Sequence, residues 1–283
     1  MSEFPFGDGP PFAAHAPLRD ERGNTTLRVR EATSVGALLL SAKNLSKRFG
    51  GLAAVDNVSI DLYCNHIHAV IGPNGAGKST LTNLLSGDLP PTSGTVALGG
   101  VNITGWTPEK ISRQGLGRSY QKTNIFLPFT VWDNVHLAAQ SRAPQSYKWL
   151  SNASKFIATR ARTERAIELS GLKRRVKSTA GTISHGEQRQ LEIAMTLATD
   201  PQVILLDEPL AGMGAVEAER MVALLLAIKK DHGILLVEHD MDAVFSLADK
   251  LTVMVNGQVI ASGTPLEIRS DAGVQAAYLG EEH

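Results

Sequence analysis

The feature that most restricts the fold of this chain is a glycine-rich loop between an apolar run and a helical pattern. Residues 72–79 have the sequence Gly-Pro-Asn-Gly-Ala-Gly-Lys-Ser, which fits the phosphate-loop pattern G-x-x-x-x-G-K-[ST] without a gap. The run His68–Ile71 predicts a buried strand before the loop, and Lys78–Leu85 predicts a helix after it. An ordinary glycine turn before a helix is the alternative, and the flanking strand and helix disfavour it. The pattern therefore predicts a strand–loop–helix unit that binds phosphate.

The residue types in this loop have a physical reason. Glycines let the backbone turn so that several N–H groups point at phosphate oxygens next to a helix N-terminus. Lys78 can supply positive charge to the terminal phosphates, and the hydroxyl of Ser79 can ligate magnesium. The residues expected to bind the phosphates are Gly72, Pro73, Asn74, Gly75, Ala76, Gly77, Lys78, Ser79 and Thr80.

Patterns on either side of the loop indicate the fold class. Short apolar or β-branched runs predict strands at Ala37–Lys43 and Val58–Tyr63, and later runs alternate with helical patterns. Strands that alternate with helices predict an α/β fold whose mainly parallel sheet is covered on both sides. Gly99-Gly100 and Asn256-Gly257 each separate two β-type runs, so they predict antiparallel hairpins.

Two ranges depart from this alternation. Between about 122 and 182 the apolar period is helical, which predicts a helical insertion in the α/β core. Residues 1–36 contain four prolines and no apolar period, so we expect a flexible extension there. We therefore expect one domain over residues 37–283 after this extension.

Composition excludes several classes of protein. Lys+Arg and Asp+Glu are equal at 28 each, so bulk positive charge does not favour a nucleic-acid binder. The single cysteine, Cys64, excludes an intramolecular disulfide and indicates a reducing compartment. No run approaches the roughly 18 to 20 apolar residues of a membrane-spanning helix, and the N-terminus lacks the pattern of a secretory signal. We expect a protein that serves a membrane, if at all, through a partner.

A second pattern places two carboxylates after an apolar run. Val203–Leu206 predicts a buried strand, and Asp207-Glu208 follow at its carboxyl end, where ligands gather in parallel sheets. Asp207 is expected to hold magnesium, directly or through water, and Glu208 to orient and deprotonate an attacking water. Taken alone, these residues are explained equally well by a strand end exposed to solvent. A phosphate loop earlier in the same chain makes this alternative less favoured.

A third pattern, Ile183-Ser184-His185-Gly186-Glu187-Gln188, opens the helical run that ends at Leu197. Ser184 with Glu187 three residues later is typical of a capping box at a helix N-terminus. Taken alone, this structural explanation is preferred.

Together, the patterns resemble the ordered motifs of an ABC-type ATPase over about 38–265. The motifs are Gly72–Thr80, Gln121, Ser184–Gln188, Asp207-Glu208 and His239. Ile183 stands where the family usually has Leu, and His185-Gly186-Glu187 replaces Gly-Gly-Gln, but Ser184 and the Gly186 backbone are kept. The resemblance implies an α/β phosphate-loop ATPase with a mainly parallel core sheet, an antiparallel β subdomain and a helical insertion, and it implies ATP and Mg²⁺ as cofactors.

The resemblance also implies roles for single residues. Ser184, His185, Gly186, Glu187 and Gln188 contact the ATP held by a second subunit in this family. Gln121 contacts magnesium and the attacking water, His239 contacts the γ-phosphate and Glu208, and Phe49 stacks on adenine. Without the resemblance, Gln121 would be a surface residue, His239 structural or exposed, and Phe49 part of the core.

Further segments are similar to the ATP-binding subunits of branched-chain amino acid importers and their urea or amide relatives. They are Arg118-Ser119-Tyr120-Gln121, Phe126, Thr130-Val131, Asp133-Asn134-Val135, Pro209–Met213, Gly263-Thr264-Pro265, Ile268 and Tyr278–Glu281. The lipopolysaccharide-export ATPase shares much of the C-terminus but matches less well around Gln121.

This similarity implies an ATPase subunit that energises an importer from the cytoplasmic face of the inner membrane. Its expected partners are permease subunits, a second ABC ATPase in a homo- or heterodimer, and indirectly an extracytoplasmic solute-binding protein, with no nucleic acid. A lipid-type exporter remains an alternative. A soluble ABC ATPase that acts on DNA or ribosomes is disfavoured, because it usually needs two ATPase halves or a long coiled-coil insertion. The transported solute is not encoded in this chain.

Overall fold

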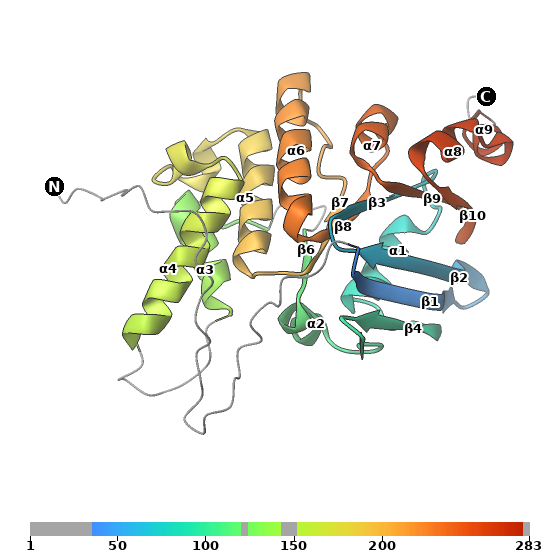
Figure 1. Cartoon of the computed structure of the whole chain (residues 1–283), viewed down its shortest axis with the longest axis horizontal. Helices are drawn as coiled ribbons and strands as arrows, with labels where there is room; N and C mark the ends of the chain where they lie inside the picture. Colours follow the sequence, from blue (N-terminus) through green and yellow to red (C-terminus); the bar gives the residue numbers. More distant parts are fainter. Residues whose placement is uncertain (1–35, 120–123, 143–151, 280–283) are drawn as a thin grey trace. The chain divides into compact units, whose positions relative to one another are not determined.

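A computed structural model describes residues 36–119, 124–142 and 152–279, which form two sheets with helices around them (Figure 1). The strands are β1 (Leu38–Phe49), β2 (Leu52–Tyr63), β3 (His66–Ile71), β4 (Ser93–Leu98), β5 (Val101–Asn102), β6 (Leu116–Arg118), β7 (Val203–Asp207), β8 (Gly233–Val237), β9 (Lys250–Val255) and β10 (Gln258–Gly263). The α-helices are α1 (Lys78–Ser86), α2 (Pro108–Gln114), α3 (Val131–Gln140), α4 (Asn152–Leu169), α5 (His185–Ala198), α6 (Ala215–Ile228), α7 (Met241–Leu247), α8 (Pro265–Ser270) and α9 (Ala272–Leu279).

The larger sheet has six strands in the order β10-β9-β3-β8-β7-β6. All of them run parallel except the edge strand β10, so the predicted mainly parallel sheet is confirmed. Val237 of β8 pairs with Val70 of β3 on one side and with Asp207 of β7 on the other. Because these three strands end in one row, the loops that follow them leave the sheet at the same edge.

The smaller sheet is antiparallel, in the order β2-β1-β4-β5. The two predicted hairpins are both confirmed. Gly99-Gly100 joins β4 to β5, and Asn256-Gly257 joins β9 to β10. Asn256 and Gly257 have φ values of 49° and 80°, the left-handed pair that a tight hairpin turn requires.

Strands β1 and β2 are longer than the sequence predicts. Both continue through polar residues that break the apolar alternation, and the pairing register shifts between Ala42 and Leu45. Asn44 and Asn57 have φ values of 50° and 55°, and the side-chain amide of Asn44 donates to Asn57 Oδ1 at 2.8 Å. The irregular pairing thus lets both strands continue where side chains no longer alternate strictly between the two faces of the sheet.

Successive residues of the central strands face two different hydrophobic clusters. Ile204 and Leu206 of β7 belong to the cluster that includes the apolar faces of α5 and α6. Val203 and Leu205 belong to the cluster that includes β1, β2 and α1. Because the parallel sheet is buried on both faces, its strands are continuous apolar runs in the sequence.

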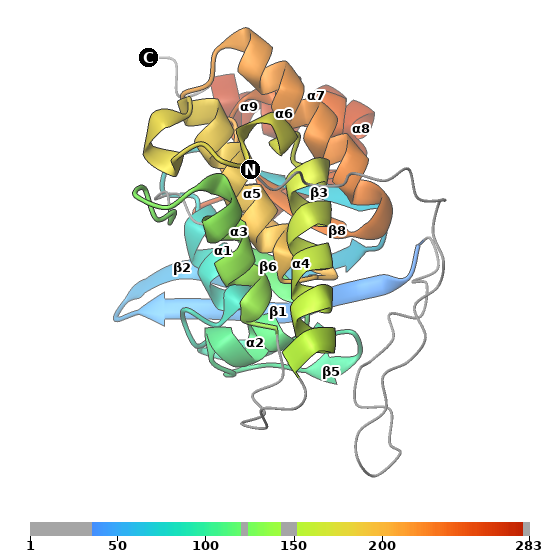
Figure 2. The same cartoon turned by 90° about the vertical axis from the view of Figure 1, so that its left-hand side faces the viewer.

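Helices α3, α4 and α5 pack together at one side of the larger sheet (Figure 2). Helix α3 begins at Thr130 with a capping box, in which Asp133 N donates to Thr130 Oγ1 at 3.1 Å. His136 Nδ1 lies 3.1 Å from Thr163 Oγ1 and joins α3 to α4. In the chain, α3 and α4 lie between β6 and α5, within the range where the sequence predicts mostly helices.

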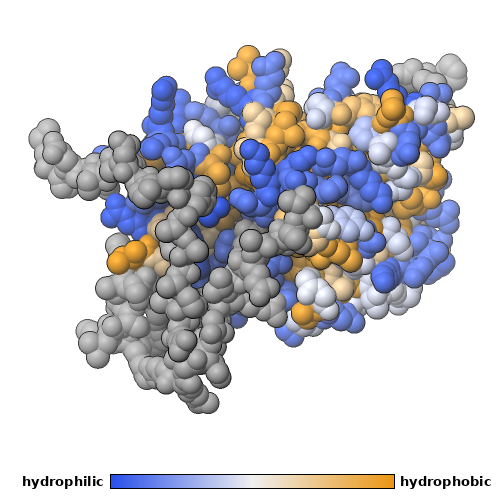
Figure 3. Space-filling view, viewed as in Figure 1, coloured by the Kyte–Doolittle hydropathy of each residue, from blue (hydrophilic) through white to orange (hydrophobic). Residues whose placement is uncertain are grey.

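Hydrophilic and hydrophobic side chains are mixed on the face seen in Figure 3. None of the helices in the described ranges combines the length and the apolar character that a membrane span requires.

One core histidine is buried in its neutral form. His68 of β3 is 2% exposed, its Nδ1 lies 3.1 Å from the carbonyl oxygen of Asp61, and its Nε2 lies 2.8 Å from Thr252 Oγ1. A neutral ring satisfies both contacts, with Nδ1–H donating to Asp61 and Nε2 accepting from Thr252. Burial lowers the pKa of His68 from 6.5 to about 4, although the bond to Asp61 opposes this shift.

We therefore expect His68 to make stability depend on pH. The unfolded chain binds this proton below about pH 6.5 and the folded chain only below about pH 4, so stability is lost as the pH falls between these values. The full contribution is on the order of 3 kcal/mol. Urea unfolding across this range should give a shallower pH slope for His68→Gln than for the unmodified chain. An unchanged pH slope in His68→Gln would show that this histidine does not link stability to pH.

Candidate functional site

The phosphate loop lies between β3 and α1, so the predicted strand–loop–helix unit is confirmed. Gly72 and Gly77 have φ values of 151° and 99°, which glycine adopts at little cost. A Cβ atom at Gly72 would collide with the carbonyl oxygen of Met254 in β9, and one at Gly77 with that of Ala54 in β2. A side chain at either position would therefore displace the loop from the strands that support it.

The ammonium group of Lys78 lies over this loop. Its Nζ donates to the carbonyl oxygens of Gly72 at 2.5 Å and Pro73 at 2.9 Å. Asn74, Gly75 and Ser79 are exposed, so a ligand can reach the loop from solvent. The ammonium and the N-terminus of α1 together favour an anion here.

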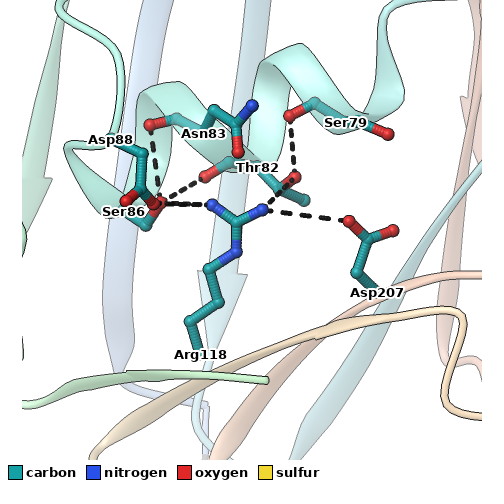
Figure 4. A network of polar contacts seen from close by, with 7 residues as sticks. All are labelled: Ser79, Thr82, Asn83, Ser86, Asp88, Arg118 and Asp207. Atoms are coloured by element: carbon teal, nitrogen blue, oxygen red, sulfur yellow. Dashed lines mark hydrogen bonds and ion pairs between the residues drawn. The ribbon is translucent and has the colours of Figure 1, made fainter. Parts of the chain in front are cut away.

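Behind the loop, the guanidinium of Arg118 on β6 joins α1 to the end of β7 (Figure 4). Nη1 donates to Ser86 Oγ and to Asp88 Oδ2, both at 2.7 Å. Nη2 lies 3.4 Å from Thr82 Oγ1 and 3.8 Å from Asp207 Oδ2. The side chains of Arg118 and Asp207 are 8% and 5% exposed, so solvent screens their attraction little. Arg118 therefore fixes Asp207 relative to the helix that follows the phosphate loop.

Asp207 has the properties of a metal ligand at this edge of the sheet. Its Oδ1 is buried and has no hydrogen-bond partner among the described residues. Burial raises the pKa of Asp207, and the Arg118 guanidinium opposes that shift. A buried carboxylate oxygen that lacks a protein partner costs free energy, which a bound cation offsets. Asp207 and the hydroxyl of Ser79 are oxygen donors of the kind that Mg²⁺ prefers, so these residues fit that ion.

Glu208 follows Asp207 in an uncommon backbone conformation. Its φ is 51°, a region that residues other than glycine enter at a cost, and its N–H donates to the Val237 carbonyl oxygen at 2.8 Å. Its Oε1 lies 3.8 Å from Nδ1 of His239, which follows β8. The Glu208 side chain is 29% exposed and that of His239 is 64% exposed. The two loops thus place a carboxylate and an imidazole together where water can reach both.

A buried carboxylate, Glu238, connects these two loops. The residue is 1% exposed; its Oε1 accepts from Leu210 N at 2.8 Å and its Oε2 from His239 N at 3.1 Å. Burial raises the pKa of Glu238, and these backbone donors oppose the shift. Leu210 lies two residues after Glu208, so one side chain holds the segment after β7 against the segment after β8.

The Ser184 segment lies in a different place from the phosphate loop. The predicted capping box is confirmed: Glu187 N donates to Ser184 Oγ at 3.2 Å, and Ser184 N donates to Glu187 Oε2 at 3.0 Å. Gln188 donates to the Ala180 carbonyl oxygen at 3.1 Å. These residues begin α5, beside a pocket of about 250 Å³ lined by Arg175, Ser184, Gly186, Glu187, Gln190, Glu217 and Arg220. No phosphate-loop residue lines this pocket.

Two further site residues were predicted from the sequence, and the structure describes one of them, Phe49. Phe49 ends β1 and is 49% exposed, with Lys47 Nζ 5.3 Å from its ring centre. An exposed ring at the end of a strand is available for stacking, so the alternative interpretation of Phe49 as a core residue is wrong. Gln121 lies outside the described residues, two positions beyond the end of a described range.

Comparison with known proteins agrees with this geometry. Residues 55–211, more than half of the chain, match the ABC transporter family. The chain belongs to this family, as an ATP-binding domain. Residues 258–283 match a family described as branched-chain amino acid ATP-binding cassette transporter.

Relatives of the ABC domain match it over most of its length. The high-affinity branched-chain amino acid transport ATP-binding protein LivG of Escherichia coli K12 is 38% identical over 86% of this chain and 98% of LivG. The corresponding protein BraF of Pseudomonas aeruginosa is 37% identical over the same shares. The lipopolysaccharide export system ATP-binding protein LptB of E. coli K12 is 31% identical, over 86% of this chain and 98% of LptB.

Solved structures agree with the fold. The ADP conformation of an ATP-binding cassette from an ABC transporter has a TM-score of 0.74 and 30% identity, and the match covers 87% of this chain and all of that one. The predicted fold class, a mainly parallel sheet with an antiparallel sheet and helices, is confirmed.

Sequence analysis did not find Arg118 or Glu238 as parts of the site. Arg118 entered only in the run that ends at Gln121, and Glu238 was assigned no role. Each is a charged residue at or next to the end of a buried apolar strand of this ABC domain. That pattern identified Asp207-Glu208, and it could have identified these two residues as well.

We expect Arg118→Met to destabilise the ABC domain. Removal of the guanidinium leaves Asp207 buried without its ion-pair partner and breaks the bonds to Ser86 and Asp88, so the free energy of unfolding should fall by roughly 3 kcal/mol or more. Denaturant unfolding measures this. Arg113→Met, an exposed site on α2, should change the same quantity by less than about 0.5 kcal/mol. Equal values for the two variants would show that the network around Arg118 adds no net stability.

Proposed function

We propose that this chain binds ATP with magnesium, hydrolyses the ATP and thereby energises transport of branched-chain amino acids or related small polar solutes through a membrane permease. The observation that carries the proposal is the convergence of three loops at one edge of the parallel sheet. The phosphate loop, Asp207-Glu208 and His239 follow neighbouring strands that end in register. The names of the relatives and the match over residues 258–283 support the solute class.

Each residue predicted to belong to the site has one proposed role. The loop amides and Lys78 bind the phosphates, Ser79, Asp207 and Gln121 hold magnesium, and Phe49 stacks on adenine. The metal, when bound, neutralises phosphate charge that develops during transfer. Glu208 accepts a proton from the attacking water, and His239, 3.8 Å away, contacts the γ-phosphate and orients Glu208. The positive φ of Glu208 fits this role, because strained backbone is found at sites that must hold one geometry.

The position of the Ser184 segment supports a two-subunit site. Within one chain, Ser184, Gly186 and Glu187 line a pocket to which no phosphate-loop residue contributes. We propose that these residues contact ATP held by a second ABC ATPase, either a copy of this chain or a related one. Each dimer then has two composite sites, and hydrolysis requires association.

An exposed apolar segment before α3 suits the proposed permease. Phe126, Leu127 and Phe129 are between 46% and 51% exposed, and the two phenylalanine rings stack with centres 5.4 Å apart. A groove of about 220 Å³ between β6, α3 and α5 is lined in part by Asn124, which precedes this segment. Exposed apolar side chains grouped in this way favour a partner, and we propose peripheral attachment of residues 37–283 to the inner membrane through it, with a solute-binding protein on the far side.

An export function is the second candidate, because LptB is also a relative. Its identity of 31% is lower than the 38% of LivG, and the C-terminal match favours the transporter of amino acids. Uptake of labelled leucine by a strain that lacks this gene decides between them. Unchanged uptake of every branched-chain amino acid would remove the proposed solute class.

We predict different defects for the two neighbouring carboxylates. Glu208→Gln should still bind MgATP but hydrolyse it roughly 100- to 10,000-fold more slowly, since an amide cannot accept the proton. ATP should then accumulate a closed dimer, visible by size-exclusion chromatography with ATP and not with ADP, together with the second ATPase if one copurifies. Asp207→Asn should instead weaken magnesium-dependent binding of ATP, measured by calorimetry.

Lys78→Ala is the matched control for the dimer. Adding it to Glu208→Gln removes the charge that binds the terminal phosphates, so ATP should no longer produce the dimer. If Glu208→Gln hydrolyses ATP at the original rate, Glu208 is not the base and His239 becomes the next candidate.

A further inference from the structure

The single hydrogen of the Ser184 hydroxyl is already donated within one chain. The hydroxyl oxygen accepts from Glu187 N at 3.2 Å, and its hydrogen is donated to Oε1 of Glu217 on α6 at 2.8 Å. A serine hydroxyl has a single hydrogen to donate. Ser184 therefore cannot donate to a phosphate oxygen while it donates to Glu217.

The carboxylate of Glu217 also covers Gly186. A Cβ atom at Gly186 would lie 2.7 Å from both Cδ and Oε1 of Glu217 and 3.1 Å from its Cγ. The Glu217 side chain thus packs on the backbone of the first turn of α5, and Gly186 is buried although it lies next to the exposed Ser184. The positive end of the α5 dipole lies at the same turn, where anions are stabilised.

We propose that Glu217 is a positioning residue that occupies, within the chain, the place on Ser184 and Gly186 that a phosphate of the second subunit's ATP takes. The inference rests on the proposed role of the Ser184 segment in that composite site. A carboxylate and a phosphate carry charge of the same sign, and both need the same hydrogen of Ser184. The carboxylate of Glu217 must therefore leave Ser184 before a phosphate binds there.

The helix that carries Glu217 makes such an exchange feasible. Glu217 lies in the first turn of α6 and is only half-buried, so its side chain can turn toward solvent without disturbing the core. Glu187 is held separately by Arg175, whose Nε donates to Glu187 Oε1 at 2.8 Å. The capping box therefore remains when Glu217 leaves, and the backbone of the first turn of α5 keeps its position. Glu217 therefore opposes association of the two subunits around ATP, and a phosphate of the ATP must displace its carboxylate.

Inorganic phosphate tests this contact without a second subunit. The amide resonances of Gly186 and Glu187 are followed by NMR during a phosphate titration of the full chain and of Glu217→Ala and Glu217→Gln. Loss of a charge-assisted bond and of like-charge repulsion should lower the phosphate concentration at the midpoint by about tenfold or more in both variants. The amides of the phosphate loop report a second site in the same spectra and should titrate equally in all three proteins.

Glu219→Gln is the matched control. This residue is on the same helix, is exposed and does not line the pocket, so its removal changes the net charge equally but should leave the midpoint at Gly186 unchanged. Equal midpoints in the original chain and in Glu217→Ala would overturn the proposal, and so would the absence of any phosphate effect on Gly186 in Glu217→Ala.

A second experiment separates this inference from the proposed function. In the Glu208→Gln background, Glu217→Ala should reduce the ATP concentration needed for dimer formation by about tenfold. A dimer that forms with unchanged ATP dependence contradicts the role of Glu217 and leaves the composite site intact. A lower phosphate midpoint in Glu217→Ala, together with no ATP-dependent dimer in any variant, supports the contact with Glu217 and contradicts the composite site.

Discussion

The parallel pairing of β3, β8 and β7 is the constraint on which the site depends. Val70, Val237 and Asp207 lie in one row of this pairing, so three loops that are far apart in the sequence leave the sheet at one edge. A shift of one residue in β7 would turn Asp207 to the other face of the sheet. The two apolar clusters prevent such a shift, because Ile204 and Leu206 face one cluster and Val203 and Leu205 face the other. Core packing therefore sets the register, and the register sets the position of the carboxylates.

Charged groups behind the site connect these loops to one another. Arg118 joins α1 to Asp207, and Glu238 joins the segment after β7 to the segment after β8. Buried charges cost free energy unless hydrogen bonds satisfy them. Here the bonds go to backbone N–H groups and to side chains at the edge of the sheet, so the same bonds that offset burial also limit movement of the loops. Stability and positioning thus depend on the same few contacts.

Local patterns predicted much of this architecture. The phosphate loop, the hairpin at Asn256-Gly257 and the capping box of Ser184 each depend on residues within a few positions, and each is confirmed. The bonds of Arg118 to Asp88, of Leu210 to Glu238 and of Ser184 to Glu217 join residues 30, 28 and 33 positions apart. Nothing in local spacing specifies them, because they depend on which strands and helices become neighbours. The extent of β1 was missed for a different reason, since irregular pairing at Asn44 breaks the apolar alternation.

The polar groups assigned to ATP already have partners within the chain, and this affects the energetics of binding. Lys78 Nζ donates to the Gly72 and Pro73 carbonyl oxygens, and Ser184 donates to Glu217. A ligand that replaces such partners exchanges one hydrogen bond for another, so each contact contributes only the difference between the two. Asp207 Oδ1 is the exception, because it has no partner among the described residues, and a cation there adds an interaction without removing one. Under the proposed assignment, a cation at Asp207 therefore adds more to affinity than either Lys78 or Ser184, whose contacts with ATP replace hydrogen bonds that already exist.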